Sequence, residues 1–134
     1  MSQMSDYLES AIINHLFRGS AFSAPTTLYV ALYTTDPTDA GGGVEVSGGS
    51  YARVAVTCNT TNWSAPGTSG TTSNSNAITF PAATANWGTI GAMAFFDAAS
   101  GGNMLVWLDI SPGVAVNSGQ TASFAAGALS VTAA

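Results

Sequence analysis

Residues 87–110, WGTIGAMAFFDAASGGNMLVWLDI, decide the fold of this chain. The segment predicts two strands, Thr89–Asp97 and Met104–Ile110, because each is an apolar run rich in strand-forming side chains. The connection between them, Ala98–Asn103, consists of small residues, glycine and asparagine, which suit a turn that needs positive φ. We therefore predict a β-hairpin.

Both strands of this hairpin are apolar on both faces. A strand with one face in water would instead alternate between apolar and polar residues. The hairpin is therefore expected either at the centre of a sheet that is covered on both sides, or covered on one side by another protein chain. With strict alternation, one face of the first strand would carry Ile90, Ala92, Ala94 and Phe96, and its other face Met93 and Phe95. One face of the second strand would carry Met104, Val106, Leu108 and Ile110, and its other face Leu105 and Trp107.

Charged residues are scarce in the chain. They make up 7% of it, whereas hydrophobic residues make up 46%, and a typical domain has about a quarter of charged residues. There is no lysine, and the arginines are Arg18 and Arg53. Such an uncharged polar surface is typical of a protein that is surrounded by neighbouring proteins, although a monomer with an uncharged polar surface has the same composition.

The net charge of −5 argues against several kinds of partner. Nucleic acid requires a track of basic side chains, which two separate arginines cannot form. The shortage of basic side chains also argues against binding to an anionic membrane surface. No apolar run is long enough to span a bilayer. Cys58 is the only cysteine, so no internal disulfide can form, and the first ten residues lack the features of a secretion signal.

One helix is predicted, at residues 4–18. Ser5 is a suitable N-cap, acidic residues follow it in the first turn, and Gly19 can end the helix. Apolar side chains recur at helical spacing and form a wide stripe. We expect this stripe to dock on one face of the sheet. The stripe consists of Met4, Leu8, Ile12, Ile13, Leu16 and Phe17.

The rest of the chain, residues 27–132, predicts short strands separated by turns. Residues 59–76 are rich in Ser, Thr, Gly and Asn, and we expect a variable surface loop there, anchored by Trp63. About eight strands predict a single all-β domain over residues 1–134, a β-sandwich or a partly open barrel, with the N-terminal helix packed on it. Besides the hairpin, the predicted strands are Thr27–Thr34, Tyr51–Cys58, Asn76–Phe80, Val114–Val116, Thr121–Ala125 and Ala128–Thr132.

A long loop, Asp36–Ser50, follows the first of these strands and is rich in glycine and acidic residues. Ordering such a segment costs conformational entropy, but the segment offers carboxylates and backbone groups to a neighbour. We predict that it is mobile in the isolated chain and ordered in an assembly. The interface residues predicted from this loop and from the tryptophans are Asp36, Asp39, Gly41, Gly42, Gly43, Glu45, Trp63 and Trp107.

The aromatic residues leave two interpretations open. Flat aromatic faces beside Asn and Asp side chains can bind sugars, so the chain can be a glycan-binding module with Trp63 in its site. Trp and Tyr are also enriched in cores and in protein interfaces, and packing is the favoured interpretation.

Catalytic chemistry finds little support in the sequence. His15 is the only histidine, and no G-x-S-x-G stretch presents a nucleophile to it. Asp36 and Asp39 could bind a cation through loop oxygens, but their spacing is that of ordinary turn residues. Asp97 and Asp109 flank the hairpin and could form an acid–base pair only if a cleft joined them. We predict a protein that is not an enzyme and has no cofactor.

Several long stretches resemble a family of small tailed-bacteriophage virion proteins, usually labelled tail fibre or tail-fibre-like. The similarity extends over nearly the whole chain, mainly excepting residues 59–75. The run LYVALYTTDPTD followed by EVSGGSYAR is its most specific part. The matching stretches are MSDYLESAIINHLFRGSAF, PTTLYVALYTTDPTDAGGGVEVSGGSYARVAV, AITFP, NWGT, FDAASGGN and VNSGQTASFAAGALSVT.

The resemblance implies a non-enzymatic virion component that assembles in the host cytoplasm, and it supplies no catalytic residues. Its partners would be other virion proteins, either of the tail or the major capsid protein, and a second copy or a host surface glycan are further candidates. The chain has no heptads or tandem repeats that would build a long shaft. Capsid decoration, as a cement protein on the head, therefore stays open beside the tail-fibre role.

Overall fold

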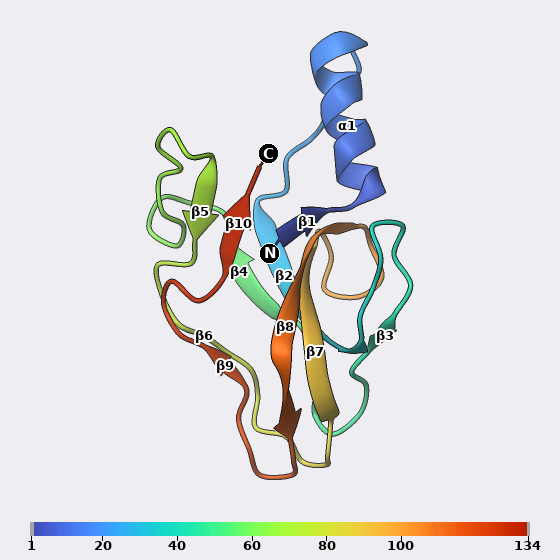
Figure 1. Cartoon of the computed structure of the whole chain (residues 1–134), viewed down its shortest axis with the longest axis vertical. Coiled ribbons are helices and arrows are strands. Elements are labelled where there is room, and N and C mark those ends of the chain that lie inside the picture. The colour runs from blue at the N-terminus through green and yellow to red at the C-terminus, as the bar shows by residue number, and fades with distance from the viewer. Residues whose placement is uncertain (1, 134) are drawn as a thin grey trace.

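The structure, a computed structural model, describes residues 2–133 as ten strands and one helix (Figure 1). The predicted fold class, all-β with one helix near the N-terminus, is confirmed. Among the described residues, no helix combines the length and apolar character that crossing a membrane requires. The elements are β1 (Ser2–Met4), α1 (Asp6–Phe17), β2 (Thr27–Thr35), β3 (Val44–Glu45), β4 (Val54–Thr57), β5 (Thr71–Ser73), β6 (Ile78–Thr79), β7 (Gly88–Phe96), β8 (Met104–Val116), β9 (Ser123–Phe124) and β10 (Ser130–Thr132).

The strands form one large sheet and two small ones. The large sheet has the order β1-β8-β7-β2-β3. Strand β2 also pairs with β4, so β3 and β4 are both its partners. The pairs β10-β5 and β6-β9 form the small sheets, and all pairings are antiparallel. The predicted hairpin is β7 with β8, and it lies at the centre of the large sheet.

Both faces of the large sheet are buried at its centre, around the hairpin turn end of β7 and β8, as the hairpin sequence predicts. The main core lies between this sheet and the small sheets and includes Val30, Met93 and Phe95. A second cluster covers the opposite face. This chain alone buries both faces, so the hairpin needs no other protein to cover it. The second cluster consists of Ala31, Tyr33, Ala92, Ala94, Phe96, Met104 and Trp107.

Two irregularities change the predicted facing of the hairpin side chains. Ile90 faces the main core instead of the side of Ala92, because the pairing register shifts between these two residues. Leu105 also packs in the main core beside Val106, because β8 has one residue more than β7 at this point. A bulge of this kind interrupts the alternation of side chains along the strand. Beyond the first irregularity β8 continues to Val116, so the predicted strand Val114–Val116 is part of it.

The helix begins later than predicted. Met4 belongs to β1, where it pairs with Val106 of β8, and the helix starts at Asp6. Ser5 is the N-cap, as predicted: its hydroxyl accepts the backbone N–H of Leu8 at 3.1 Å and donates to the backbone oxygen of Met104. The short strand therefore fixes the start of the helix against β8.

The prediction that the apolar stripe of the helix covers a face of the sheet is wrong. The helix stands clear of the sheet at one end of the molecule (Figure 1), and none of its described residues is buried. Leu8, near its start, packs against the main core, whereas Ile13, Leu16 and Phe17 are 52%, 66% and 78% exposed. The small sheets provide the reason, because they cover the core face that the helix was expected to cover.

The predicted surface loop, 59–76, is only partly a loop. Its C-terminal part contains β5, which pairs with β10, and the buried Asn74. The Asn74 amide donates to the backbone oxygens of Asn76 and Ala125 and accepts the backbone N–H of Leu129, each at 2.9 Å. A polar composition predicted exposure here, but a buried amide is stable when backbone groups satisfy it.

Candidate functional site

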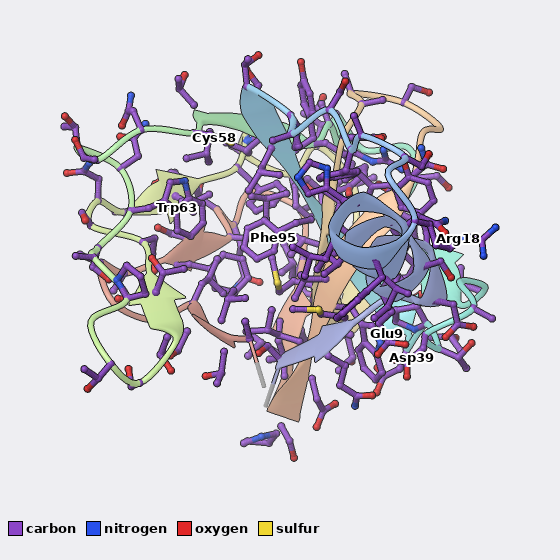
Figure 2. All side chains as sticks on the ribbon, turned by 90° about the horizontal axis from the view of Figure 1, so that it is seen from above. Glu9, Arg18, Asp39, Cys58, Trp63 and Phe95 are labelled. Atoms are coloured by element: carbon purple, nitrogen blue, oxygen red, sulfur yellow. The ribbon has the colours of Figure 1, made fainter. Side chains whose placement is uncertain are left out.

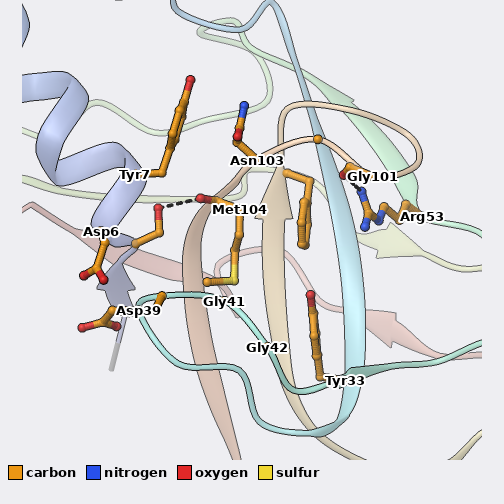
Figure 3. Close-up of a pocket in the computed structure, with 14 residues that line it drawn as sticks. Asp6, Tyr7, Tyr33, Asp39, Gly41, Gly42, Arg53, Gly101, Asn103 and Met104 are labelled. Atoms are coloured by element: carbon orange, nitrogen blue, oxygen red, sulfur yellow. Dashed lines mark hydrogen bonds between the residues drawn. The ribbon is translucent and has the colours of Figure 1, made fainter.

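A polar hollow lies on the second face of the sheet, beside the start of α1 (Figure 3). Its volume is about 390 Å³. Three segments form its walls: the start of the helix, the tip of the Asp36–Ser50 loop, and the turn of the hairpin. The lining residues are Ser5, Asp6, Tyr7, Tyr33, Asp39, Ala40, Gly41, Gly42, Arg53, Phe96, Gly101, Gly102, Asn103 and Met104.

Arg53 connects the hairpin turn, which forms one wall of the polar hollow, to Phe96 of β7. Its guanidinium carbon lies 3.8 Å from the centre of the Phe96 ring. Its Nη1 donates to the backbone oxygens of Ala98 and Gly101, at 2.9 Å each, and so holds the hairpin turn. The Arg53 side chain is 7% exposed. This buried cation therefore stabilises the sheet and the turn together, and it is not available to an incoming ligand.

Glu45 is the anionic partner of Arg53. Its two oxygens accept from Nε and Nη2 at 2.9 Å, and the Tyr51 hydroxyl donates to Oε2 at 2.7 Å. Burial alone would raise the pKa of Glu45, but the hydrogen bonds from Arg53 and Tyr51 outweigh it and lower the pKa. Burial, followed by the bond to Glu45, raises the pKa of Tyr51. Glu45, predicted as an interface residue, is therefore used within the fold.

Asp39 attaches the tip of the loop to two other elements. Its Oδ1 accepts the indole N–H of Trp107 at 3.0 Å, and its backbone oxygen accepts the N–H of Asp6 at 2.8 Å. Further along the loop, a Cβ on Gly43, whose φ is +71°, would lie 2.6 Å from the backbone oxygen of Thr35. The loop therefore has fixed contacts in the single chain, which argues against the predicted mobility.

Asp36 occupies a different place from Asp39. It lies over Gly91, where a Cβ would be 2.9 Å from its Oδ1, and it faces Asp109 of β8. Burial first, and then the hydrogen bond and charge of Asp109, raise the pKa of Asp36. The two loop aspartates do not converge. Within residues 2–133, no group of three or more His, Cys, Asp or Glu residues is placed to hold a metal ion.

The other catalytic candidates have structural contacts. His15 Nδ1 accepts the backbone N–H of Phe22 at 3.0 Å, which holds the segment that follows the helix. Asp97 accepts the backbone N–H of Asn103 at 2.7 Å and its side-chain amide at 2.9 Å, inside the hairpin turn. Asp109 pairs with Ala92, well away from that turn. The acid–base pair considered from the sequence therefore does not form.

Of the two predicted tryptophans, Trp107 is packed within the fold, whereas Trp63 is half-buried and lines an apolar hollow. Trp107 is 9% exposed and belongs to the second cluster. Trp63 packs edge-on against Phe95, with ring centres 5.5 Å apart and planes at 73°. The contributions of Tyr7, Arg53 and Asn103 to the polar hollow were not predicted from the sequence. The segments joined there are distant in sequence, and no local signal connects them.

An apolar hollow of about 250 Å³ opens beside the start of α1 (Figure 2). Viewed from above, Trp63, Phe95 and Cys58 lie to one side of the helix, while Arg18 points away from the molecule. The hollow is the open end of the main core, between the helix and the β5-β10 sheet. Its lining residues are Leu8, Leu28, Cys58, Trp63, Thr72, Phe95, Leu105, Val106 and Val131.

Comparison with known protein families shows the family of the chain. Residues 3–132 match the family described as Podophage GP4 fiber I protein gp80. The chain belongs to this family. A comparison with curated proteins found none that matches the chain.

Membership of the gp80 fibre family confirms the resemblance to tail-fibre-like virion proteins. The match begins within β1 and ends at the last residue of β10, so it includes the helix and every strand of the domain. The chain is therefore a fibre-type structural protein of a phage, and it associates with other components of the virion. The two hollows are the candidate surfaces for that association.

Proposed function

We propose that this chain is a non-enzymatic component of the tail appendages of a tailed phage, located on the outside of the particle. The observation that carries the proposal is the match to the gp80 fibre family over residues 3–132. The shortage of charged residues, at 7% of the chain, also fits a protein whose surface is occupied by neighbours. The protein assembles with the particle in the host cytoplasm.

The use of the polar side chains supports a structural role. His15 accepts a hydrogen bond from a backbone N–H, Asp39 accepts one from an indole N–H, and Glu45 forms an ion pair with Arg53. A catalytic acid or base must instead lie within hydrogen-bond reach of a substrate proton. These three side chains are therefore committed to the fold, and their loss would lower stability rather than a turnover rate.

Contacts with the next virion protein are assigned to the exposed tip of the Asp36–Ser50 loop. Gly42 and Val44 lie in water, Val44 is 54% exposed, and nothing is within 4 Å of the Cβ position of Gly42. Asp36 is also exposed, whereas the side chains of Asp39 and Glu45 are used internally. On this loop the proposed contacts are therefore Asp36, Gly42 and Val44, and the attachment of the loop to the sheet lowers the entropy cost of binding.

Gel densitometry of purified virions tests the location. Tail appendages predict a few to a few dozen copies per particle, since one tail has few attachment points. The alternative, a cement protein on the head, predicts hundreds of copies. If the protein is absent from purified particles, both versions fail.

A second candidate function is binding of a host surface glycan in the polar hollow. Tyr7 favours it, because this ring is 44% exposed at the rim, with Asp6 and Asn103 also lining the hollow. An aromatic face beside polar groups can bind a sugar ring. In a glycan array, Tyr7→Ala and Asn103→Ala should each abolish a signal that Val114→Ser, an exposed site at the other end of β8, leaves intact. A signal unchanged by both would exclude the polar hollow.

A further inference from the structure

Strand β4 presents unused main-chain groups along one edge. Just beyond the strand, the Cys58 N–H donates to the Thr26 oxygen at 2.9 Å, which fixes the residues of β4 that bond to β2. In an antiparallel pair, every second residue turns its N–H and C=O away from the neighbouring strand. Ala55 and Thr57 do so here, and both are exposed. The edge of β4 away from β2 therefore carries main-chain donors and acceptors.

Strand β6 presents a second edge of this kind, on the side of β4 away from β2 (Figure 1). The Phe80 N–H donates to the Ala122 oxygen at 2.9 Å in the pairing with β9, so Ala77 and Thr79 turn their main-chain groups away from β9. A groove of about 370 Å³, which we call the edge groove, is lined by both β4 and β6. Among the described residues, β4 pairs with β2 and β6 with β9, so neither edge has a strand partner across the edge groove.

A side chain already takes the place of a strand at one end of the edge groove. The Asn62 side-chain amide donates to the outward-facing Thr57 oxygen at 3.0 Å, and the Asn76 amide donates to Asn62 Oδ1 at 3.3 Å. A side-chain amide offers the same kinds of donor and acceptor as a peptide group. Within residues 2–133, the outward N–H groups of Ala55 and Thr57 have no comparable partner. The edge groove thus binds one amide group where a main chain would lie and leaves further positions open.

The edge of β4 also lacks the features by which proteins protect a strand edge. Charged side chains, proline and β-bulges discourage pairing with another chain. Strand β4 has the sequence VAVT, without charge or proline, and its pairing with β2 has no bulge. Strand β3, which also pairs with β2, has both Glu45 and a shift in register. Strand β4 is therefore the edge that is open to a further strand.

We propose that an extended segment of a neighbouring virion protein binds in the edge groove as an added β-strand, with main-chain hydrogen bonds to Ala55 and Thr57. The four residues of β4 span about 13 Å at roughly 3.3 Å per residue, so about four residues of the segment pair with it. A second copy of this chain has its strands paired within its own sheets and would have to release one. The inference rests on the association with other virion proteins and holds for a location on the tail or on the head.

The lining of the edge groove determines the kind of segment that fits. No Asp, Glu, Lys or Arg among the described residues lines it, and its polar side chains are Asn amides and Thr hydroxyls. A charged side chain placed there would lose water without gaining an opposite charge. The added strand is therefore expected to have uncharged side chains, while its main chain supplies the hydrogen bonds.

Hydrogen exchange at single-residue resolution, on the free protein and on intact phage particles, tests the pairing. The Ala55 and Thr57 amides should exchange rapidly in the free protein and at least about tenfold more slowly in the particle, because a strand partner then accepts their hydrogen bonds. The Val56 amide bonds to β2 and should be protected in both states, which makes it the internal control. Equal rates for Ala55 and Thr57 in the two states would overturn the proposal.

Proline substitution tests whether these N–H groups are needed. Ala55→Pro removes an outward N–H and keeps the bonds to β2, and edge strands tolerate proline at such positions. In phages that carry the variant, gel densitometry should show at least about tenfold fewer copies per particle, because a main-chain bond is lost and the ring obstructs the edge. Ala55→Ser keeps the N–H and should be incorporated normally. Thr57→Pro and Thr57→Ser repeat the comparison at the second N–H, with urea unfolding of each purified variant as the check on folding. Equal incorporation of the folded proline and serine variants would contradict the proposal.

Photochemical cross-linking identifies the occupant of the edge groove. A benzophenone amino acid in place of Thr79, on the edge opposite β4, should cross-link in the particle to a peptide of another virion protein, at a stretch without charged residues. A cross-link to a second copy of this chain, or particles that contain the chain and give no cross-link, would overturn the assignment.

Discussion

Replacing Arg53 by methionine is the change for which the structure gives the clearest expected effect. The substitution keeps much of the apolar stem but removes four hydrogen bonds of 2.9 Å, two to Glu45 and one each to the backbone oxygens of Ala98 and Gly101. It also removes the cation from the Phe96 ring, at 3.8 Å. Glu45 would keep its charge without its main partner.

The expected loss follows from these contacts. Breaking a buried ion pair from one side costs about 3–5 kcal/mol, because the remaining charge is left unpaired. Glu45 is 25% exposed, so water can solvate it in part and the lower end of that range applies. We therefore expect the free energy of unfolding to fall by about 3 kcal/mol. Much of this loss comes from the unpaired Glu45 carboxylate, so the double variant Arg53→Met/Glu45→Gln should be about 1 kcal/mol more stable than Arg53→Met.

Urea unfolding followed by tryptophan fluorescence measures this change. Arg18→Met is the matched control, because Arg18 is exposed and the same atoms are removed; it should alter the free energy of unfolding by less than about 0.5 kcal/mol. If the two variants lose the same amount, or if Glu45→Gln adds its full cost to Arg53→Met, the reasoning is refuted.

Three further predictions concern the loop. The folded-state pKa of Glu45 is lowered from its usual 4.5, so the contribution of this carboxylate to stability is present above pH 4.5 and is lost as the pH falls through the lower folded-state pKa. In Glu45→Gln the free energy of unfolding should therefore fall less steeply with acid. Equal slopes in the two proteins would contradict this. Gly43→Ala should lower the free energy of unfolding, measured in urea, by about 2 kcal/mol, because Gly43 has a positive φ and its Cβ position approaches the backbone of Thr35. Gly42→Ala lacks the close contact and should lower it clearly less. Equal losses would show that the approach to Thr35 has no effect. In hydrogen exchange on the free protein, the Val46 amide should be protected by its 2.9 Å bond to the Leu32 oxygen, and rapid exchange there would restore the mobile-loop hypothesis.

Local patterns predicted the parts of the fold that depend on local interactions. The strand predicted at Thr27–Thr34 is β2, which ends one residue later. The hairpin turn and the Ser5 N-cap also follow from residue types at short spacing. In each case the residue types that carry the signal lie within a few positions of each other.

Long-range competition decided what the sequence could not predict. The apolar stripe of the helix is real, but the small sheets occupy the core face it would cover, so Leu16 and Phe17 remain exposed. The facing of Leu105 depends on a bulge in its pairing with β7, which no residue type announces. Met4 has helical spacing, yet its backbone gains more by pairing with Val106 at the edge of the sheet.

The candidate site shows the same division. The sequence drew attention to the Asp36–Ser50 loop, and its tip does form one wall of the polar hollow. The use of Glu45 by Arg53, and of Asp39 by Trp107, depends on contacts between residues 8 and 68 positions apart. Carboxylates predicted to meet another protein are consumed inside the fold, because the chain's own buried donors require them.

A difference map between wild-type phage particles and particles that lack this chain tests the central claim most directly. We expect density to disappear from the tail appendages in the mutant, with a head that is unchanged and a loss of a few to a few dozen copies. Density lost from the outer surface of the capsid, or two indistinguishable particles, would contradict the assignment to the tail.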